Sequence, residues 1–406
     1  MSFQQGLSGL NAASKNLDVI GNNVANASTV GFKGSRAEFA DVYATSLSGS
    51  GGNNIGIGVN VMAVAQQFTQ GNITVTNNPM DVAINGAGFY RLSNNGAITY
   101  SRNGQFQVDK DGYIVNATGQ NLTGYPPNSL GGVTTAAPTN LQISYADLAP
   151  TVTSAATATV NLDSRATAVS SAAFNINDST TYQGATSMPI YDSLGNQHSL
   201  SMYFVKTAAN SWDVYGANDG TQISAAPIGQ VNFTSSGAID TTTTTMPISL
   251  SLPVTTGAGT IAMTLDLTGS TQFGSAFGTN TLSQDGYAAG KLSGFSIADD
   301  GTVTGRYTNG QTRAQGQVAL SNFTNPQGLT SLGNNQWAET SQSGPPLTGG
   351  PKTGTLGTLQ SGATEDANID LTAELVNMIT AQRVYQANAQ TIKTQDSVMQ
   401  TLVNLR

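Results

Sequence analysis

The chain has 406 residues, no cysteine, one histidine and a formal net charge of −8 at pH 7. Without cysteine it has neither disulfides nor thiolate metal sites, and an acidic balance with no basic cluster argues against partners such as nucleic acid or anionic membranes. Charged residues make up 9% of the chain, against about 25% in ordinary globular chains, and 46 glycines accompany many neutral polar residues. This composition is typical of several domains built from short strands and tight turns.

An amphipathic helix is predicted at the N-terminus, from about residue 3 to about residue 25. Its seam positions alternate four and three residues apart. They are Phe3, Leu7, Leu10, Ser14, Leu17, Gly21 and Val24. Gly6, Gly9 and Gly21 each weaken an isolated helix by about 1 kcal/mol relative to alanine, so we expect this helix to be ordered only when it is packed.

The segment after this helix is rich in asparagine and glycine and runs from residue 22 to residue 36. Asparagine at a helix end can adopt cap or left-handed conformations, Gly31 permits a turn, and Phe32 could anchor the chain to a core. From residue 53 to residue 71 the sequence predicts an extended connector with a strand or two, because glycines interrupt any helix there.

Regular turn signals start at Met80. Asn-Gly and Asp-Gly pairs at positions 85, 95, 103 and 111 separate short apolar runs, and the same pattern returns at positions 300 and 309. Such pairs supply the positive φ angles of tight hairpins and predict an antiparallel meander. We expect the blocks 76–145 and 285–355 to form one β-rich domain.

An insert at about 146–284 interrupts this β-rich domain. It is rich in Ala, Thr and Ser, and its clearest hairpin runs from Pro189 to Phe204, turns at 193–196 and continues at 212–215. A threonine run at 241–245 suggests strands with long exposed loops. The insert is therefore predicted to be a separate, outermost β-domain.

Motifs for catalysis or for cofactor and metal binding are weak. The one histidine, His198, lies in a predicted strand, where a surface or packing role is expected rather than catalysis. A calcium-loop pattern begins at Gln107 but has Thr118 where a bidentate Glu is needed, and a phosphate-loop spacing at 344–349 has Gly350 where Lys is required. We therefore expect no catalytic, cofactor-binding or metal-binding residues and no enzyme activity.

A second, longer helix is predicted from Leu371 to Arg406, after a Pro/Gly linker at 344–362, and Asp370 could cap it. Its seam positions again alternate four and three residues apart. They are Leu371, Leu375, Met378, Gln382, Tyr385, Ala389, Ile392, Asp396, Met399 and Val403. The polar residues Gln382 and Asp396 are of the kind that fixes register or partner number in a coiled coil. The helix either packs on its own domain or needs a partner helix.

The predicted fold is mostly β with a terminal α-helical coiled coil, in which the N- and C-terminal helices pair. Two β-rich outer domains consist of antiparallel hairpins, and the outermost is inserted into the other. The expected parts are a helical domain (1–30 with 365–406), an extended connector (31–75 with 356–364), a β-rich domain (76–145 with 285–355) and the insert (146–284).

Two segments at opposite ends of the chain resemble the terminal signatures of the bacterial flagellar rod and hook family. The first runs from Asn22 to Lys33 and the second from Glu374 to Gln390. The signature residues are Asn22, Asn23, Asn26, Thr29, Gly31, Phe32, Lys33, Gln382, Arg383, Tyr385 and Asn388. The segments 80–90 and 101–106 also look like family segments, whereas the insert carries little signature.

This resemblance implies a structural subunit of the flagellar hook, because the insert is similar to that subunit's additional outer domain. Its implied role is a self-assembling curved helical tube, a flexible coupling that transmits torque from rod to filament. The seam residues of both helices would then form the self-assembly surface. The alternatives are a distal rod protein of the same family and, from another class, a secreted β-rich adhesin.

The resemblance also implies partners and a location. The partners are other copies of the chain in a homopolymer, the distal rod protein, the hook-filament junction protein, the hook cap protein, the hook length-control protein and the flagellar type III export apparatus. Nucleic acid binding and membrane insertion are not expected. The location is the flagellar hook outside the cell, reached without a cleaved signal peptide, which agrees with the lack of a basic start and an apolar run before Lys15.

Overall fold

A computed structural model describes residues 2–42, 56–128, 132–134 and 136–404. The chain forms two compact units, and each is described by itself. Unit 1 comprises Met1–Ser144, Gly294–Arg306 and Thr312–Arg406, and unit 2 comprises Tyr145–Ser293 with Tyr307–Gln311.

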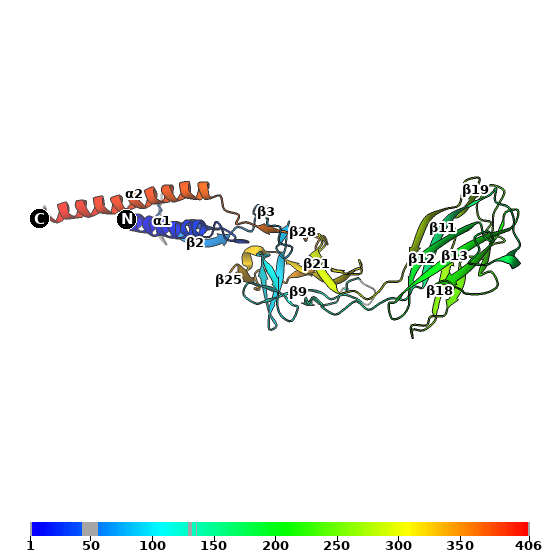
Figure 1. The fold of residues 1–406 in the computed structure, drawn as a ribbon. Coiled ribbons are helices and arrows are strands. Elements are labelled where there is room, and N and C mark those ends of the chain that lie inside the picture. Colours follow the sequence, from blue (N-terminus) through cyan, green and yellow to red (C-terminus); the bar gives the residue numbers. More distant parts are fainter. Residues whose placement is uncertain (1, 43–55, 129–131, 135, 405–406) are drawn as a thin grey trace. The chain divides into compact units, whose positions relative to one another are not determined.

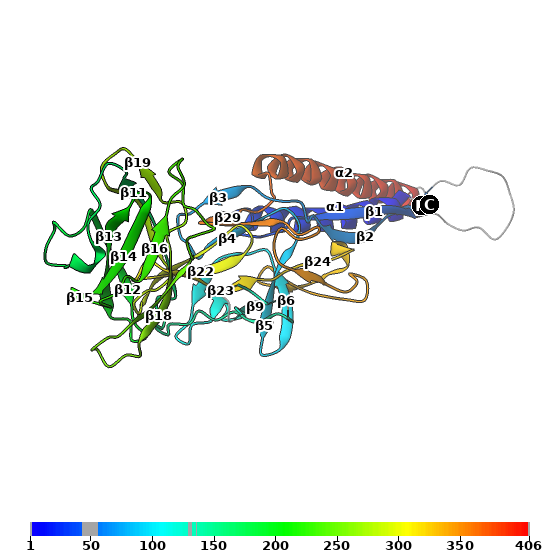
Figure 2. The ribbon, with the colours of Figure 1, turned by 90° about the vertical axis from the view of Figure 1, so that its right-hand side faces the viewer.

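Two antiparallel helices lie side by side in unit 1, α1 (Ser2–Ala25) and α2 (Leu371–Asn404) (Figures 1 and 2). At the start of α1, Gly6 lies against Ile392, and α2 continues past the N-terminus of α1 (Figure 1). The Oδ1 atom of Asp370 accepts hydrogen bonds from the backbone N–H groups of Thr372 and Ala373, which caps α2. The two predicted helices and their pairing are confirmed.

A hairpin of β1 (Ser35–Val42) and β2 (Gly58–Gln66) packs along α1. The Gln5 side-chain amide donates a hydrogen bond to the carbonyl of Gly56, and the backbone N–H of Val59 donates one to Ser8 Oγ. Polar side chains of α1 therefore join the helix to the hairpin.

The main sheet contains thirteen strands among the described residues. They are β5 (Phe89–Asn94), β6 (Ala97–Ser101), β7 (Phe106–Val108), β8 (Ile114–Asn116), β9 (Asn121–Tyr125), β10 (Thr139–Asn140), β21 (Leu292–Ile297), β22 (Thr302–Tyr307), β23 (Thr312–Val318), β24 (Leu320–Asn322), β25 (Thr330–Gly333), β26 (Gln336–Ala338) and β27 (Leu347–Gly349). Strands β5 and β6 form the hairpin predicted at Asn95-Gly96, where both φ angles are positive. Strand β23 pairs with β9, β24 with β5 and β26 with β6, so both β-rich blocks contribute to one sheet.

The start of the predicted meander differs from the structure. Strand β4 (Val82–Asn85) pairs with β28 (Thr358–Ser361) rather than with β5, and β3 (Ile73–Val75) pairs with β29 (Ala363–Glu365). Gly86 has a φ of 112°, and a Cβ atom there would lie 3.0 Å from the Cα atom of Gly357. This Asn-Gly pair therefore allows the backbone to lie close to a distant segment and does not form a hairpin turn.

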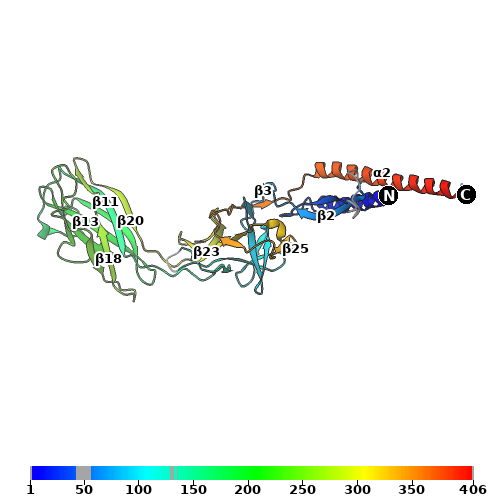
Figure 3. The same cartoon turned by 180° about the vertical axis from the view of Figure 1, so that it is seen from behind.

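Two five-stranded sheets form unit 2, and Figure 3 shows strands of both. One sheet contains β11 (Ala155–Asp163), β17 (Ile248–Leu252), β18 (Ile261–Asp266), β19 (Thr271–Phe273) and β20 (Gly278–Gln284); the other contains β12 (Gly184–Tyr191), β13 (Gln197–Ala208), β14 (Ser211–Asn218), β15 (Thr221–Gln222) and β16 (Gly229–Asn232). The predicted hairpin is confirmed, since Tyr191 of β12 lies opposite Gln197 of β13. Strand β11 pairs in parallel with β18 and β19, which the expectation of antiparallel hairpins did not include.

Alternating apolar residues from both sheets of unit 2 form one core cluster. Leu200, Met202 and Phe204 of β13 are fully buried, as is Leu265 of β18. Short 3₁₀ turns at Ser171–Ala173 and Pro326–Gly328 complete the regular structure of the described residues.

Candidate assembly site

The helix pair meets through small residues of α1. A Cβ atom built on Gly9 would lie 2.8 Å from the side-chain oxygen of Asn388, and one built on Gly6 would lie 3.1 Å from Cγ1 of Ile392. Ala13 is also buried. Glycine therefore allows a close approach of the two helices, which offsets its low helix propensity.

The predicted seam residues of α1 lie mostly outside this contact. Phe3 and Leu7 are 48% and 44% exposed. Leu10, Leu17 and Val24 are half-buried. The buried positions of α1 are instead Gly6, Ala12, Ala13, Ile20 and Asn23.

On α2, as on α1, the buried position lies outside the predicted seam. It is Ala381, the buried residue among those described. Of the predicted seam, Met378, Ala389 and Ile392 are half-buried. The remaining seam residues are exposed: Leu371, Leu375, Gln382, Tyr385, Asp396, Met399 and Val403. The helix pair thus leaves large apolar side chains of α2 exposed on the seam and also off it, where they are Val376, Ile379, Val384, Val398 and Leu402. We call the seam residues of both helices, as predicted from the sequence, the assembly seam.

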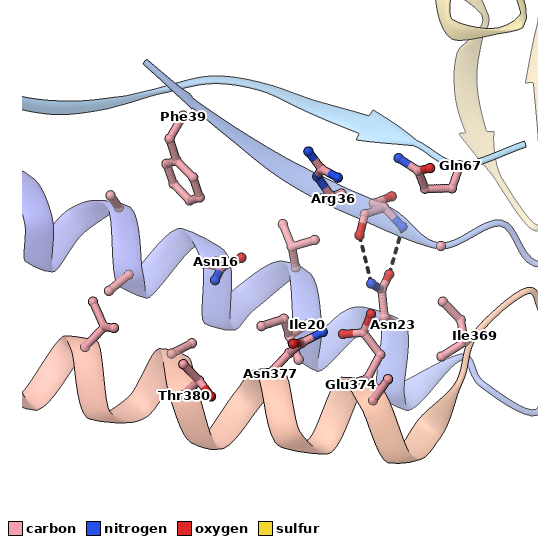
Figure 4. A pocket seen from close by; sticks show the side chains of 18 of the residues that line it. Asn16, Ile20, Asn23, Arg36, Phe39, Gln67, Ile369, Glu374, Asn377 and Thr380 are labelled. Atoms are coloured by element: carbon pink, nitrogen blue, oxygen red, sulfur yellow. Dashed lines mark hydrogen bonds between the residues drawn. The ribbon is translucent and has the colours of Figure 1, made fainter. Parts of the chain in front are cut away.

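A groove of about 750 Å³ lies between α1, α2 and the β1–β2 hairpin (Figure 4). Arg36 and Phe39 line it from β1, and Asn377 and Glu374 line it from α2. One carboxylate oxygen of Glu374 is buried and has no hydrogen-bond partner among the described residues. The α2 residues that line the groove lie outside the predicted seam.

Asn23 of the N-terminal signature joins α1 to β1. Its amide nitrogen donates to the carbonyl of Ser35 at 2.8 Å, and its amide oxygen accepts from the backbone N–H of Ser35 at 2.9 Å (Figure 4). These two bonds use the backbone N–H and carbonyl of Ser35, as a neighbouring strand would. Asn23 therefore fixes the direction in which the chain leaves α1.

Gly31 and Lys33 bring the N-terminal signature against the segment before α2. Gly31 has a φ of 70°, and its N–H donates to the carbonyl of Glu365 at 2.7 Å. A Cβ atom on Gly31 would lie 2.6 Å from the backbone nitrogen of Asn103, so no side chain fits there. The N-terminal signature, the segment before α2 and the β-rich part therefore meet at Gly31.

Three buried charges form what we call the charged joint: Lys33, Arg102 and Glu365. Lys33 Nζ lies 2.6 Å from Glu365 Oε1, and Arg102 Nη1 lies 3.0 Å from Glu365 Oε2. The backbone N–H of Gly71 also donates to Glu365 Oε1, and Lys33 Nζ donates to the carbonyl of Thr69. Burial lowers the pKa of Lys33, while the charge of Glu365 and its hydrogen bond oppose that change. One carboxylate thus neutralises one of two buried cations.

The other signature residues are less engaged in the chain. Asn26 donates to the carbonyl of Asn22 and accepts from Thr29, which closes the end of α1. Phe32 and Asn388 are half-buried, whereas Gln382, Arg383 and Tyr385 are exposed. Heptad counting of large apolar residues missed the small-residue contact of α1, and the signal that could have found it is the spacing of Gly6, Gly9 and Ala13.

The described residues contain no group of three or more His, Asp or Glu side chains arranged to hold a metal ion. Neither helix, over its described residues, is long and apolar enough to cross a membrane.

Four family models match segments in the order of the chain. They are the flagella basal body rod protein (residues 3–33), the flagellar hook protein FlgE/F/G D1 domain (83–170), the flagellar basal body protein FlaE D2 domain (161–287) and the flagellar basal body rod FlgEFG protein C-terminal model (360–405). The chain is 43% identical to the flagellar hook protein FlgE of Escherichia coli (strain K12) over 417 aligned residues, and the alignment covers 100% of both chains. The chain belongs to the flagellar hook protein family.

Relatives from other bacteria agree with this assignment. The flagellar hook proteins FlgE of Salmonella typhimurium and Borreliella burgdorferi are 42% and 33% identical, over 100% of this chain and 100% and 99% of theirs. The crystal structure of Helicobacter pylori flagellar hook protein FlgE2 has a TM-score of 0.52 at 15% identity, over 72% of this chain and 99% of that chain, which shows the fold alone. The chain is thus a structural subunit of the flagellar hook. Neither the distal rod protein nor the adhesin is favoured.

Proposed function

We propose that the assembly seam is the surface through which copies of this chain pack side by side into the hook tube. The observation that supports this is the exposure of large apolar seam residues on both helices, while Gly6 and Gly9 of α1 meet α2 at Ile392, itself a seam residue, and at Asn388. Extensive exposed apolar surface on a protein marks interaction sites. In the tube, the seams of neighbouring copies cover one another.

The four-part division of the chain suits a flexible coupling. The helical domain (1–30 with 365–406) supplies continuous apolar contact and torsional stiffness. The charged joint takes Lys33 from the connector (31–75 with 356–364), Arg102 from the β-rich domain and Glu365 from the helical domain, so it ties the three parts together. The β-rich domain (76–145 with 285–355) and the insert (146–284) touch neighbours through neutral polar faces. Losing one neutral hydrogen bond there costs about 1 kcal/mol and water can replace it, so these contacts slide as the curved tube bends and transmits torque.

The partners proposed for this subunit follow from its place in the hook. They are the distal rod protein at one end, the hook-filament junction protein at the other, the hook cap protein during growth, the hook length-control protein and the type III export apparatus. We propose that the chain leaves the cell through that apparatus without a cleaved signal peptide and that it has no catalytic activity.

The test introduces a charge on the assembly seam in a residue that is exposed in the single chain. Leu375→Glu is expected to leave the helix content of the monomer unchanged and to abolish polymerisation, because each copy would bury an unpaired carboxylate in an apolar contact. Gln386→Glu is the matched control, since it adds the same charge at an exposed position of α2 outside the seam. Tubes from Leu375→Glu that equal those of the control in yield and length, by electron microscopy, would reject the proposal.

A further inference from the structure

The one histidine of the chain is buried between two carboxylates of unit 2. His198 of β13 is 5% exposed. Its Nδ1 atom lies 2.6 Å from Oδ2 of Asp219, and its Nε2 atom lies 3.3 Å from Oδ2 of Asp192. These carboxylates belong to two different turns, so the imidazole ring connects the β12–β13 turn to the β14–β15 turn.

The two carboxylates are held differently. The side chain of Asp192 is fully buried and accepts hydrogen bonds from the backbone N–H groups of Leu194 and Asn196 and from Thr256 Oγ1. The side chain of Asp219 is 51% exposed and accepts one further bond, from the backbone N–H of Ser199. Asp192 is therefore fixed, whereas Asp219 can turn to water.

The protonation state of His198 decides how many of these bonds exist. A protonated imidazole has two N–H donors and a neutral imidazole has one. Burial lowers the pKa of His198, but its hydrogen bonds and charge interactions with Asp219 and Asp192 outweigh that effect and raise the pKa above the ordinary value. These two carboxylates are the charged groups that act on the ring. Only the protonated, cationic ring of His198 can donate a hydrogen bond to both carboxylates.

The turn that carries Asp192 rests on the strands by which the chain enters and leaves unit 2. A Cβ atom on Gly195, in that turn, would lie 2.8 Å from Cβ of Pro150 and 3.3 Å from the backbone nitrogen of Ala289. The entering and leaving segments pair with each other through backbone bonds between Leu148 and Gly290. A change that loosens the β12–β13 turn therefore acts on the two segments through which the chain enters and leaves unit 2.

We propose that His198 is a proton-dependent clamp, which holds the β14–β15 turn to the β12–β13 turn when the ring is charged and releases Asp219 when the ring is neutral. Asp219 is the carboxylate released because its exposed oxygen exchanges the ring for water, while the neutral ring keeps its remaining proton toward the buried Asp192. The clamp is independent of the assembly seam and goes beyond the proposed function. It makes the attachment end of the insert stiffer in acid and looser in alkali.

The sign of the pH effect follows from the raised pKa. The stabilisation is fully present below the pKa of an unfolded histidine, about 6.5, and is lost as the pH rises through the higher pKa of the folded protein. The change therefore falls at a pH above that at which an ordinary histidine titrates.

The test uses the full chain, in which His198 supplies the one histidine Cε1–H resonance. We expect that resonance to titrate with a pKa above 6.5, and amide exchange in residues 191–199 and 216–222 to rise severalfold between pH 5.5 and pH 9, after correction for intrinsic rates. Residues 267–279 of the same unit carry no titratable side chain and are the internal reference. A pKa at or below 6.5, or no change in protection relative to this reference, would overturn the proposal.

Two variants separate the clamp from a general effect of charge. Asp219→Asn keeps Asp192 in place but removes one of the two carboxylates that raise the pKa of His198, so that pKa is expected to fall and the pH dependence of the two turns to shrink. Asp240→Asn is the matched control, because Asp240 caps a turn of unit 2 through Thr242 and Thr243 and does not bond to His198. Equal pKa values of His198 in both variants would also refute the clamp.

Discussion

The helix pair of unit 1 exposes many of its large apolar side chains, whereas the two sheets of unit 2 bury theirs. In unit 2 the large side chains face one another, and Phe204, Trp212 and Leu252 are fully buried. In α2 large apolar residues are exposed along the helix, with Val403 at 72%. Unit 2 thus closes its own core, whereas the helix pair leaves apolar surface exposed, which under the proposed function another copy covers.

A second difference between the two regions concerns charge. The charged joint of unit 1 pairs Lys33 with Glu365, 332 positions away, whereas the buried pair of unit 2, His198 and Asp192, joins residues six positions apart. A buried ion pair adds little net stability, but removing one partner leaves an uncompensated charge. The comparison therefore predicts that neutralising a single side chain of the charged joint is costly for unit 1 and leaves unit 2 unaffected.

The largest effect is expected for Glu365→Gln. This change leaves Lys33 and Arg102 buried with no counter-charge, so it should lower the free energy of unfolding of unit 1 by about 3–5 kcal/mol. Lys33→Met is the graded comparison, because a neutral Arg102–Glu365 pair remains and the expected loss is about 1–3 kcal/mol. Trp337 fluorescence during denaturation reports on unit 1.

The control for the charged joint uses the other unit. The two tryptophans lie in different units, Trp337 in unit 1 and Trp212 in unit 2, so Trp212→Phe provides a background in which Trp337 alone is measured. Amide exchange in β13 and β14 should be the same in Glu365→Gln and in the parent chain. A loss as large for Lys33→Met as for Glu365→Gln would show that the hydrogen bonds, and not the balance of charge, hold the joint.

A smaller effect distinguishes the two faces of α1. Gly9 lies against Asn388, so Gly9→Leu should overpack the helix contact and cost about 1–3 kcal/mol. A Cβ atom on Gly21 would have nothing within 4 Å, so Gly21→Leu should stabilise the monomer by up to about 1 kcal/mol through helix propensity. Thermal unfolding of the dilute monomer followed by helical circular dichroism measures both, and equal signs for the two variants would contradict the small-residue contact.

Local patterns in the sequence determined the elements that depend on near neighbours. The four-three spacing of apolar residues predicted both helices, and Asp370 caps α2 as expected. The Asn-Gly pair at 95 and the Pro189–Phe204 run predicted hairpins that the structure contains. These features depend on residues within one or two turns of each other, so a single sequence carries them.

The failures concern partners that are distant in the sequence. Nothing near Val82 indicates that β4 pairs with β28, because the pairing of strands so far apart is decided by the whole core. The threonine run at 241–245 looked like a strand, but Asp240 accepts hydrogen bonds from the backbone and hydroxyl of Thr242, which makes a turn. The charged joint could not be predicted from local patterns either, because 332 positions separate Lys33 from Glu365.

The smallest effect on stability, and the sharpest test of the assembly seam, concerns its polar members. Gln382 and Asp396 are exposed on α2 in the single chain, so replacing both with Leu should change monomer stability by less than about 0.5 kcal/mol. In a packed seam, however, polar residues at core positions fix register at a cost in stability, and their loss permits other registers. The double variant should therefore form tubes whose helical parameters differ from those of the parent, as measured by electron microscopy. Gln386→Leu, outside the seam, should leave them unchanged, and identical tubes from all three proteins would remove any special role for Gln382 and Asp396.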